Sequence, residues 1–170
     1  MPSIVRVRKT RGEVRVANEV WIATALLHRE HPECTGFTVR EIRDRAEQEG
    51  IEKPLRPGVY QHAYHHCVAN RPRETGKYRM LFATGSLTRR LFKNGDPYDR
   101  DREGGKTAPS KSEVPERYHV LIDWYHSQYA HERPDQLTED PLLVLQGSGR
   151  ELWADEHADE YVRRLREGWE

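Results

Sequence analysis

The sequence has few cysteines and no long hydrophobic segment. Only Cys34 and Cys67 occur among its 170 residues, which is too few for the disulfide framework of a small secreted domain. The longest apolar runs, such as residues 21–27, are far shorter than the roughly 20 residues that span a membrane. Met1-Pro2-Ser3 leads into an alternating basic stretch and not into the apolar region of a signal peptide. We therefore expect a cytoplasmic protein without a membrane span.

Motifs of zinc sites and of common catalytic sites are also absent. The chain contains neither C-x-x-C nor H-E-x-x-H. His62, His65, His66 and Cys67 lie within six residues, and on a helix His62 and His66 could share a metal ion. No carboxylate is placed beside them as a general base, and no Ser/His/Asp or Cys/His arrangement can be assembled. We expect no metal, no cofactor and no enzymatic activity; the alternative is a metal-dependent nuclease that uses this histidine cluster.

Charge is distributed unevenly along the chain. The 28 Lys+Arg residues balance the 28 Asp+Glu residues. However, residues 1–110 hold 21 basic and 14 acidic residues, a difference of +7, whereas residues 111–170 hold 7 and 14, a difference of −7. The asymmetry favours a basic module that binds a polyanion, joined to an acidic interaction segment. The alternative is that the two halves merely have solvated surfaces of opposite charge, and that this separation of charge has no role in binding.

Hydrophobic periodicity predicts three helices followed by a β-hairpin. Asn18 is a candidate N-cap for the first helix, and the T-x-x-E pattern from Thr38 to Glu41 is a capping box for the second. In the third helix Tyr60 and Tyr64 form one stripe beside a stripe of small apolar residues. Alternating apolar residues around a Thr-Gly-Ser turn predict the hairpin. The predicted elements cover residues 18–31, 38–50, 57–70 and 78–92.

This order of elements resembles winged helix-turn-helix DNA-binding domains over about residues 16–95. The resemblance implies an α+β fold in which the third helix enters the major groove and the hairpin wing reaches a phosphate strand or the minor groove. Gln61 could pair with an adenine edge, and Arg56 could reach a phosphate or a guanine. A winged helix can also dock onto proteins without binding DNA. The candidate DNA-binding residues are Arg56, Tyr60, Gln61, His65, Arg71, Arg73, Lys77, Arg79, Arg89, Arg90 and Lys93.

The remaining segments define the predicted domain boundaries. Residues 4–16 alternate apolar and basic side chains, as in an arm along phosphates or an edge strand. Residues 96–115 are polar and rich in Gly, Pro and Ser, which indicates a loop. An extra helix is predicted over 115–132. We expect a winged-helix domain over residues 1–133, with a core of about 100–120 residues, and an extended acidic tail over 134–170.

Large apolar residues separated by polar spacers indicate that the tail binds a partner. Alternatively, it folds back on its own domain or packs in a homodimer. Asp140-Pro141-Leu142-Leu143, Gly147-Ser148-Gly149, Leu152-Trp153 and residues 159–166 resemble the C-terminal peptides of bacterial antitoxins that neutralise PIN-domain ribonuclease toxins. The resemblance implies that a basic side chain enters the toxin's acidic, metal-binding active site. The candidate partner-binding residues are Leu142, Leu143, Leu152, Trp153, Tyr161, Arg163, Arg164, Leu165, Arg166 and Trp169.

Together these patterns predict a bacterial transcriptional regulator of antitoxin type. It would bind double-stranded operator DNA through the winged helix, as a homodimer, and a protein partner such as a PIN-domain toxin through the tail. The alternative is a winged-helix accessory protein of a DNA restriction or processing system.

Overall fold

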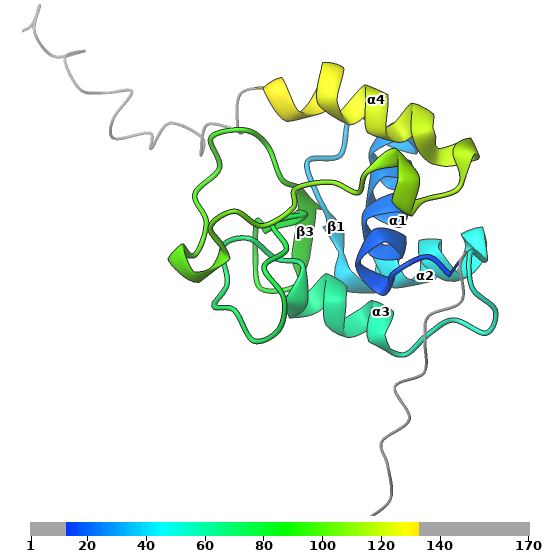
Figure 1. Ribbon diagram of the computed structural model, residues 1–170, viewed down its shortest axis with the longest axis horizontal. Coiled ribbons are helices and arrows are strands. Elements are labelled where there is room, and N and C mark those ends of the chain that lie inside the picture. Colours follow the sequence, from blue (N-terminus) through cyan, green and yellow to red (C-terminus); the bar gives the residue numbers. More distant parts are fainter. Residues whose placement is uncertain (1–12, 133–170) are drawn as a thin grey trace, which may run out of the picture. The chain divides into compact units, whose positions relative to one another are not determined.

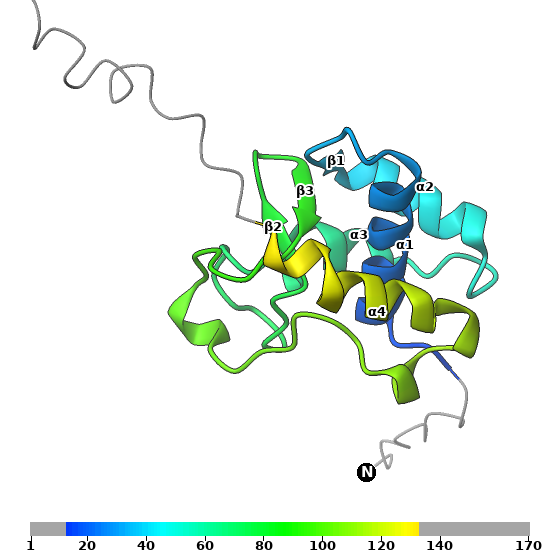
Figure 2. The same cartoon turned by 90° about the horizontal axis from the view of Figure 1, so that it is seen from above.

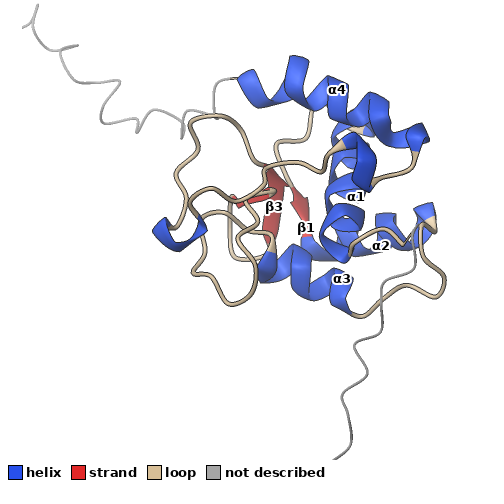
Figure 3. Cartoon of the chain, in the orientation of Figure 1, coloured by secondary structure: helices blue, strands red, loops and turns tan. Residues whose placement is uncertain are grey.

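The computed structural model describes residues 13–132, which form an α+β domain of four α-helices and a small three-stranded antiparallel sheet (Figure 3). None of the described helices is long and apolar enough to cross a membrane. The predicted basic arm before Glu13 and the predicted partner-binding residues Leu142 to Trp169 lie outside the described residues. The elements in chain order are α1 (Val16–Glu30), β1 (Phe37–Thr38), α2 (Val39–Glu49), α3 (Gly58–Gln61), β2 (Leu81–Ala83), β3 (Thr88–Leu91) and α4 (His119–Ser127).

Helix α1 lies at the centre of the core, between α4 on one side and α2 and α3 on the other (Figures 1 and 2). Val20, Trp21 and Ile22 are fully buried, because a helix that is apolar on several faces can be covered on all of them. The Trp21 ring meets the Tyr125 ring of α4 edge to face, with centroids 5.5 Å apart. The predicted N-cap is wrong: the helix begins at Val16, so Asn18 lies inside it and is buried.

Helix α2 follows its local sequence signals at both ends. The Thr38 hydroxyl accepts a hydrogen bond from the backbone N–H of Glu41 (3.1 Å), and the Glu41 carboxylate accepts one from the backbone N–H of Thr38 (2.7 Å). The hydrogen bonds that the Thr38 N–H and hydroxyl donate to this carboxylate lower the pKa of Glu41. At the other end Gly50 has φ 64°, the left-handed conformation that favours glycine. The predicted capping box is confirmed, and Gly50 ends the helix as a glycine cap.

The sheet has the order β1-β3-β2, so β3 is its central strand. Phe37 of β1 pairs with Arg89 of β3, and Leu81 of β2 pairs with Leu91. The predicted hairpin is confirmed, although its strands are shorter than residues 78–92. Strand β1 was not predicted, because two residues are too few to show alternation.

The third predicted helix ends earlier than expected. Helix α3 continues as one stretch of π-helix over His62–His66, and Cys67 ends it. Beyond this point the chain pairs with β2 instead: the oxygen of Cys67 accepts from Met80 N and Leu81 N. Asn70 exchanges two side-chain hydrogen bonds with the backbone of Ala83 (2.9 and 3.0 Å). Residues 67–70 therefore extend the hairpin and not the helix.

The extra helix predicted over 115–132 is present as α4 with short 3₁₀ turns on both sides, Glu116–Tyr118 and Tyr129–His131. It belongs to the core of the domain. The Tyr125 hydroxyl donates to the oxygen of Phe92 (2.7 Å), and the Tyr118 hydroxyl donates to the Glu49 carboxylate of α2 (2.6 Å). Burial raises the pKa of both tyrosines to about 12, and at Tyr118 the hydrogen bond to Glu49 acts in the same direction.

Candidate nucleic-acid interface

Helix α3 and its π-helical continuation have one buried and one exposed strip. Val59, Ala63 and Cys67 repeat every four residues and are fully buried, so they hold the helix against the core. Tyr60 is 40% exposed, and Gln61 is exposed beside it. The Tyr60 and Tyr64 rings are stacked, with centroids 6.0 Å apart and planes 9° apart. The exposed strip thus offers two parallel aromatic rings and one amide.

Arg71 joins this strip to the tip of the hairpin. Its guanidinium lies 5.2 Å from the centroid of the Tyr64 ring, and its Nη2 donates to the backbone oxygen of Ser86 (3.0 Å). The neighbouring Leu87 is 51% exposed. Its oxygen accepts from Val39 N at the start of α2 (2.9 Å). We call the surface formed by Tyr60, Gln61, Tyr64, Arg71, Ser86 and Leu87 the α3–hairpin face.

Arg89 was predicted to contact a phosphate strand, and the structure corrects this. Its side chain is fully buried and donates to the oxygens of Ala63 and Tyr64 at the end of the helix (3.2 and 2.9 Å). It also donates to the oxygens of Gly85, Ser86 and Thr88 around the hairpin turn. Burial lowers the pKa of Arg89 to about 10, so the guanidinium remains charged at neutral pH. Arg89 thus ties the hairpin tip to the helix.

Arg102, which no sequence pattern singled out, holds the same helix end from a second position. It donates to the oxygens of His65 and His66 (3.1 and 2.8 Å) and to those of Arg71, Pro72 and Tyr78. Burial lowers the pKa of Arg102. A cation is favourable at the carbonyl end of a helix. Among the described residues no carboxylate pairs with Arg89 or Arg102, so both charges add to the positive potential near the α3–hairpin face.

Four further predicted DNA contacts also serve the fold: Arg90, Lys93, Arg56 and Arg79. Arg90 is buried and forms a bidentate ion pair with Asp96 (2.6 and 2.8 Å). Lys93 is buried with its Nζ 3.4 Å from the Glu132 carboxylate. These positions correct the prediction, which took the hairpin cations to be solvent-facing. The physical reason is that Arg89, Arg90 and Leu91 of β3 are all buried, so side chains on both faces of this strand are covered; Lys93 follows two residues after the strand.

Arg56 and Arg79 are likewise engaged by the chain itself. Arg56 donates to the buried Glu19 carboxylate (2.6 Å) and to the oxygen of Val14 (2.7 Å). Burial raises the pKa of Glu19, while the hydrogen bond from Arg56 acts in the opposite direction. Arg79 lies over the Tyr98 ring at 4.3 Å and donates to the oxygen of Gly105 (3.2 Å). The structure thus uses Arg56 to anchor the segment before α1.

The remaining predicted contacts, His65, Arg73 and Lys77, are not fully buried. Arg73 and Lys77 are exposed in the loop that joins the helix to the hairpin. His65 is half-buried, with its Nε2 3.5 Å from the Glu74 carboxylate. The sequence analysis did not include Tyr64 or Leu87 among the candidate DNA-binding residues. The four-residue spacing between Tyr60 and Tyr64 could have indicated Tyr64, whereas no sequence pattern indicated Leu87.

The histidine cluster does not form a metal site within the described residues, where no group of three or more His, Cys, Asp or Glu could hold an ion. The Nδ1 of His62 is bonded to the oxygen of Gly58 (2.9 Å). Burial lowers the pKa of His62. His66 Nδ1 lies 3.9 Å from the Glu74 carboxylate. His65 and His66 therefore share the Glu74 carboxylate as a partner, whereas His62 bonds to the helix backbone.

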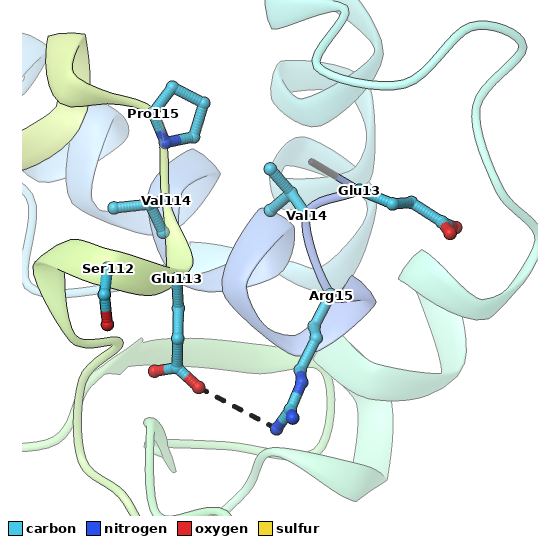
Figure 4. A pocket seen from close by; sticks show the side chains of 7 residues that line it. All are labelled: Glu13, Val14, Arg15, Ser112, Glu113, Val114 and Pro115. Carbon is cyan, nitrogen blue, oxygen red and sulfur yellow. Dashed lines mark ion pairs between the residues drawn. The ribbon is translucent and has the colours of Figure 1, made fainter. Parts of the chain in front are cut away.

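A hollow of about 340 Å³ lies between the segment before α1 and the chain that precedes α4 (Figure 4). The ion pair between Arg15 and Glu113 joins its two walls, with Nη1 and Oε1 3.8 Å apart. The lining residues are Glu13, Val14, Arg15, Ser112, Glu113, Val114 and Pro115. They include no histidine or cysteine.

No family model matches this chain, and no curated protein or solved structure matches it either.

Proposed function

We propose that residues 16–95 form a winged helix-turn-helix domain that binds double-stranded DNA. The proposal is supported by the order α1, β1, α2, α3, β2, β3 and by the pairing of β1 with β3. In this assignment α2 and α3 are the helix-turn-helix, and the β2–β3 hairpin is the wing. The observation that carries the proposal is the α3–hairpin face itself, where Arg71 bonds the exposed strip of the helix to the tip of the wing.

The side chains on this face divide into two kinds of contact. Gln61 has the amide that pairs with an adenine edge, and it is exposed on the outer strip of α3. Arg73 and Lys77 are exposed cations in the adjoining loop, where they would contact phosphates and set the register. The buried charges of Arg89 and Arg102 strengthen the field without direct contact.

The same proposal includes a regulatory role. Because the tail over 134–170 resembles antitoxin peptides, the chain would act as a bacterial transcriptional regulator of antitoxin type. It would form a homodimer on its operator and bind a PIN-domain toxin through residues such as Trp153 and Arg164. It is proposed as a binding protein and not as an enzyme.

The test measures the affinity of the full chain for duplex DNA over a range of salt concentrations. The affinity should fall steeply as salt rises. Arg73→Ala together with Lys77→Ala should reduce the slope of log K against log salt by about one to two units, because two phosphate contacts are lost. Lys111→Ala is the matched control: Lys111 is an exposed cation paired with Asp123 near α4, so the slope should not change. Absence of duplex binding at low salt would contradict the proposal.

A further inference from the structure

One face of the Tyr60 ring is covered and the other is open. Tyr64 stacks on the covered face with nearly parallel planes. Among the described residues no other ring and no cation lies over Tyr60, and the side chain is 40% exposed. An aromatic face in this position can accept one more flat group in an offset stack.

The rings beneath this open face are held in place. Tyr64 is flanked by Arg71, at 5.2 Å from its centroid, and by the buried Arg89, at 5.8 Å. Arg71 is fixed in turn by its hydrogen bond to Ser86, and Ala63 is fully buried beside Tyr64 in sequence. The stack Arg71–Tyr64–Tyr60 is therefore formed before any ligand arrives, and little side-chain freedom is lost on binding.

The surroundings select the chemistry of the ligand. Arg71, Arg73 and Lys77 lie within eleven residues after the end of the helix at His66, and such cations suit a ligand that carries phosphates. A flat group with adjacent phosphates is a nucleotide. Paired bases inside a duplex present only their edges in the grooves, because their faces are stacked on their neighbours. Away from the ends of a duplex, only an unpaired nucleotide could place its base on Tyr60.

We propose that Tyr60 stacks on an unpaired nucleobase, so that the α3–hairpin face binds a duplex containing an unpaired nucleotide more tightly than a fully paired one. This inference rests on the proposed DNA binding and names the feature of the DNA that the site prefers. Base–aromatic stacking tolerates every base, so the preference depends on the unpaired state and not on the sequence at that position.

The experiment compares two probes with the full chain: a blunt duplex, and the same duplex with one unpaired fluorescent adenine analogue whose emission is quenched by stacking. The second probe should bind roughly 5- to 100-fold more tightly, as expected for one stacked base, and its emission should fall on binding. Tyr60→Phe should keep both effects, because the ring remains. Tyr60→Leu should remove both, because an apolar side chain without a ring cannot stack.

Lys77→Ala is the matched control for this comparison. It should weaken the binding of both probes by a similar factor and leave their ratio unchanged, because a phosphate contact does not sense pairing. Equal affinity of the original chain for the two probes, or a preference that survives in Tyr60→Leu, would overturn the inference while duplex binding stands. If the chain binds only the probe that contains the unpaired nucleotide, and this binding requires the Tyr60 ring, the inference is supported and the proposed binding of fully paired DNA is overturned.

Discussion

Arg89 and Arg102 hold the same helix end from two positions. Arg89 donates to the oxygens of Ala63 and Tyr64, and Arg102 donates to those of His65 and His66. Four successive carbonyl groups at the end of the helix, where partners are commonly missing, thus accept from two buried guanidinium groups; His65 O also accepts from Val68 N (3.1 Å). The same side chains reach the hairpin turn and the loop after the helix. The shape of the α3–hairpin face therefore depends on two residues that are not exposed on it.

Arg102 is expected to be essential for stability. In Arg102→Met five backbone oxygens lose a donor, and the free energy of unfolding should fall by about 3 kcal/mol or more. Arg102→Lys should remain destabilised, because a single ammonium cannot reach acceptors spread over three segments. Urea unfolding measures both. The exposed Arg100→Ala is the control and should stay within about 0.5 kcal/mol of the original chain; an equally small change for Arg102→Met would contradict the assigned role.

The buried pair of Arg90 and Asp96 predicts non-additive substitutions. Asp96→Ala removes the bidentate carboxylate from a buried guanidinium and should cost about 3–5 kcal/mol. Combining it with Arg90→Met should restore part of that loss, because the buried charge is removed as well. A double-mutant cycle by urea unfolding measures the coupling.

The exposed pair of Lys111 and Asp123 provides the comparison for this cycle. Their side chains are 49% and 63% exposed, so Asp123→Ala should cost less than about 1 kcal/mol. If the free-energy changes of the Arg90 and Asp96 substitutions are additive, these two side chains are not coupled as their geometry implies.

Glu113 should contribute to stability above acidic pH. Hydrogen bonds from Lys106 Nζ (2.7 Å) and Ser110 N (2.9 Å) lower its pKa to about 2. Because the folded pKa lies below the ordinary value of 4.5, the contribution is complete above pH 4.5 and is lost as the pH falls toward 2. Melting temperature should therefore decline less steeply over this range in Glu113→Gln than in the original chain. Glu116→Gln, at an exposed neighbouring position, should leave the decline unchanged; parallel profiles for Glu113→Gln and the original chain would refute the prediction.

Part of the candidate site was visible in the sequence. Tyr60 and Gln61 were candidate DNA contacts because they lie beside the apolar stripe of Val59, Ala63 and Cys67. The structure exposes both side chains. Arg73 and Lys77 lie in a polar loop, where cations are normally solvated, and they too are exposed. The arginines of the hairpin were assigned wrongly, because alternation along a strand does not reveal that a strand will be central and covered on both faces.

Local signals along the chain specify α1, α2, the hairpin turn and α4, since capping residues, glycine caps and apolar periodicity act over a few residues. The end of α3, strand β1 and the roles of Arg89, Arg90 and Arg102 depend on the tertiary structure. A buried guanidinium needs several acceptors, and Arg102 finds its acceptors on residues 65–66, 71–72 and 78. These segments meet only when the domain has folded, so no pattern near position 102 can indicate that its charge is buried.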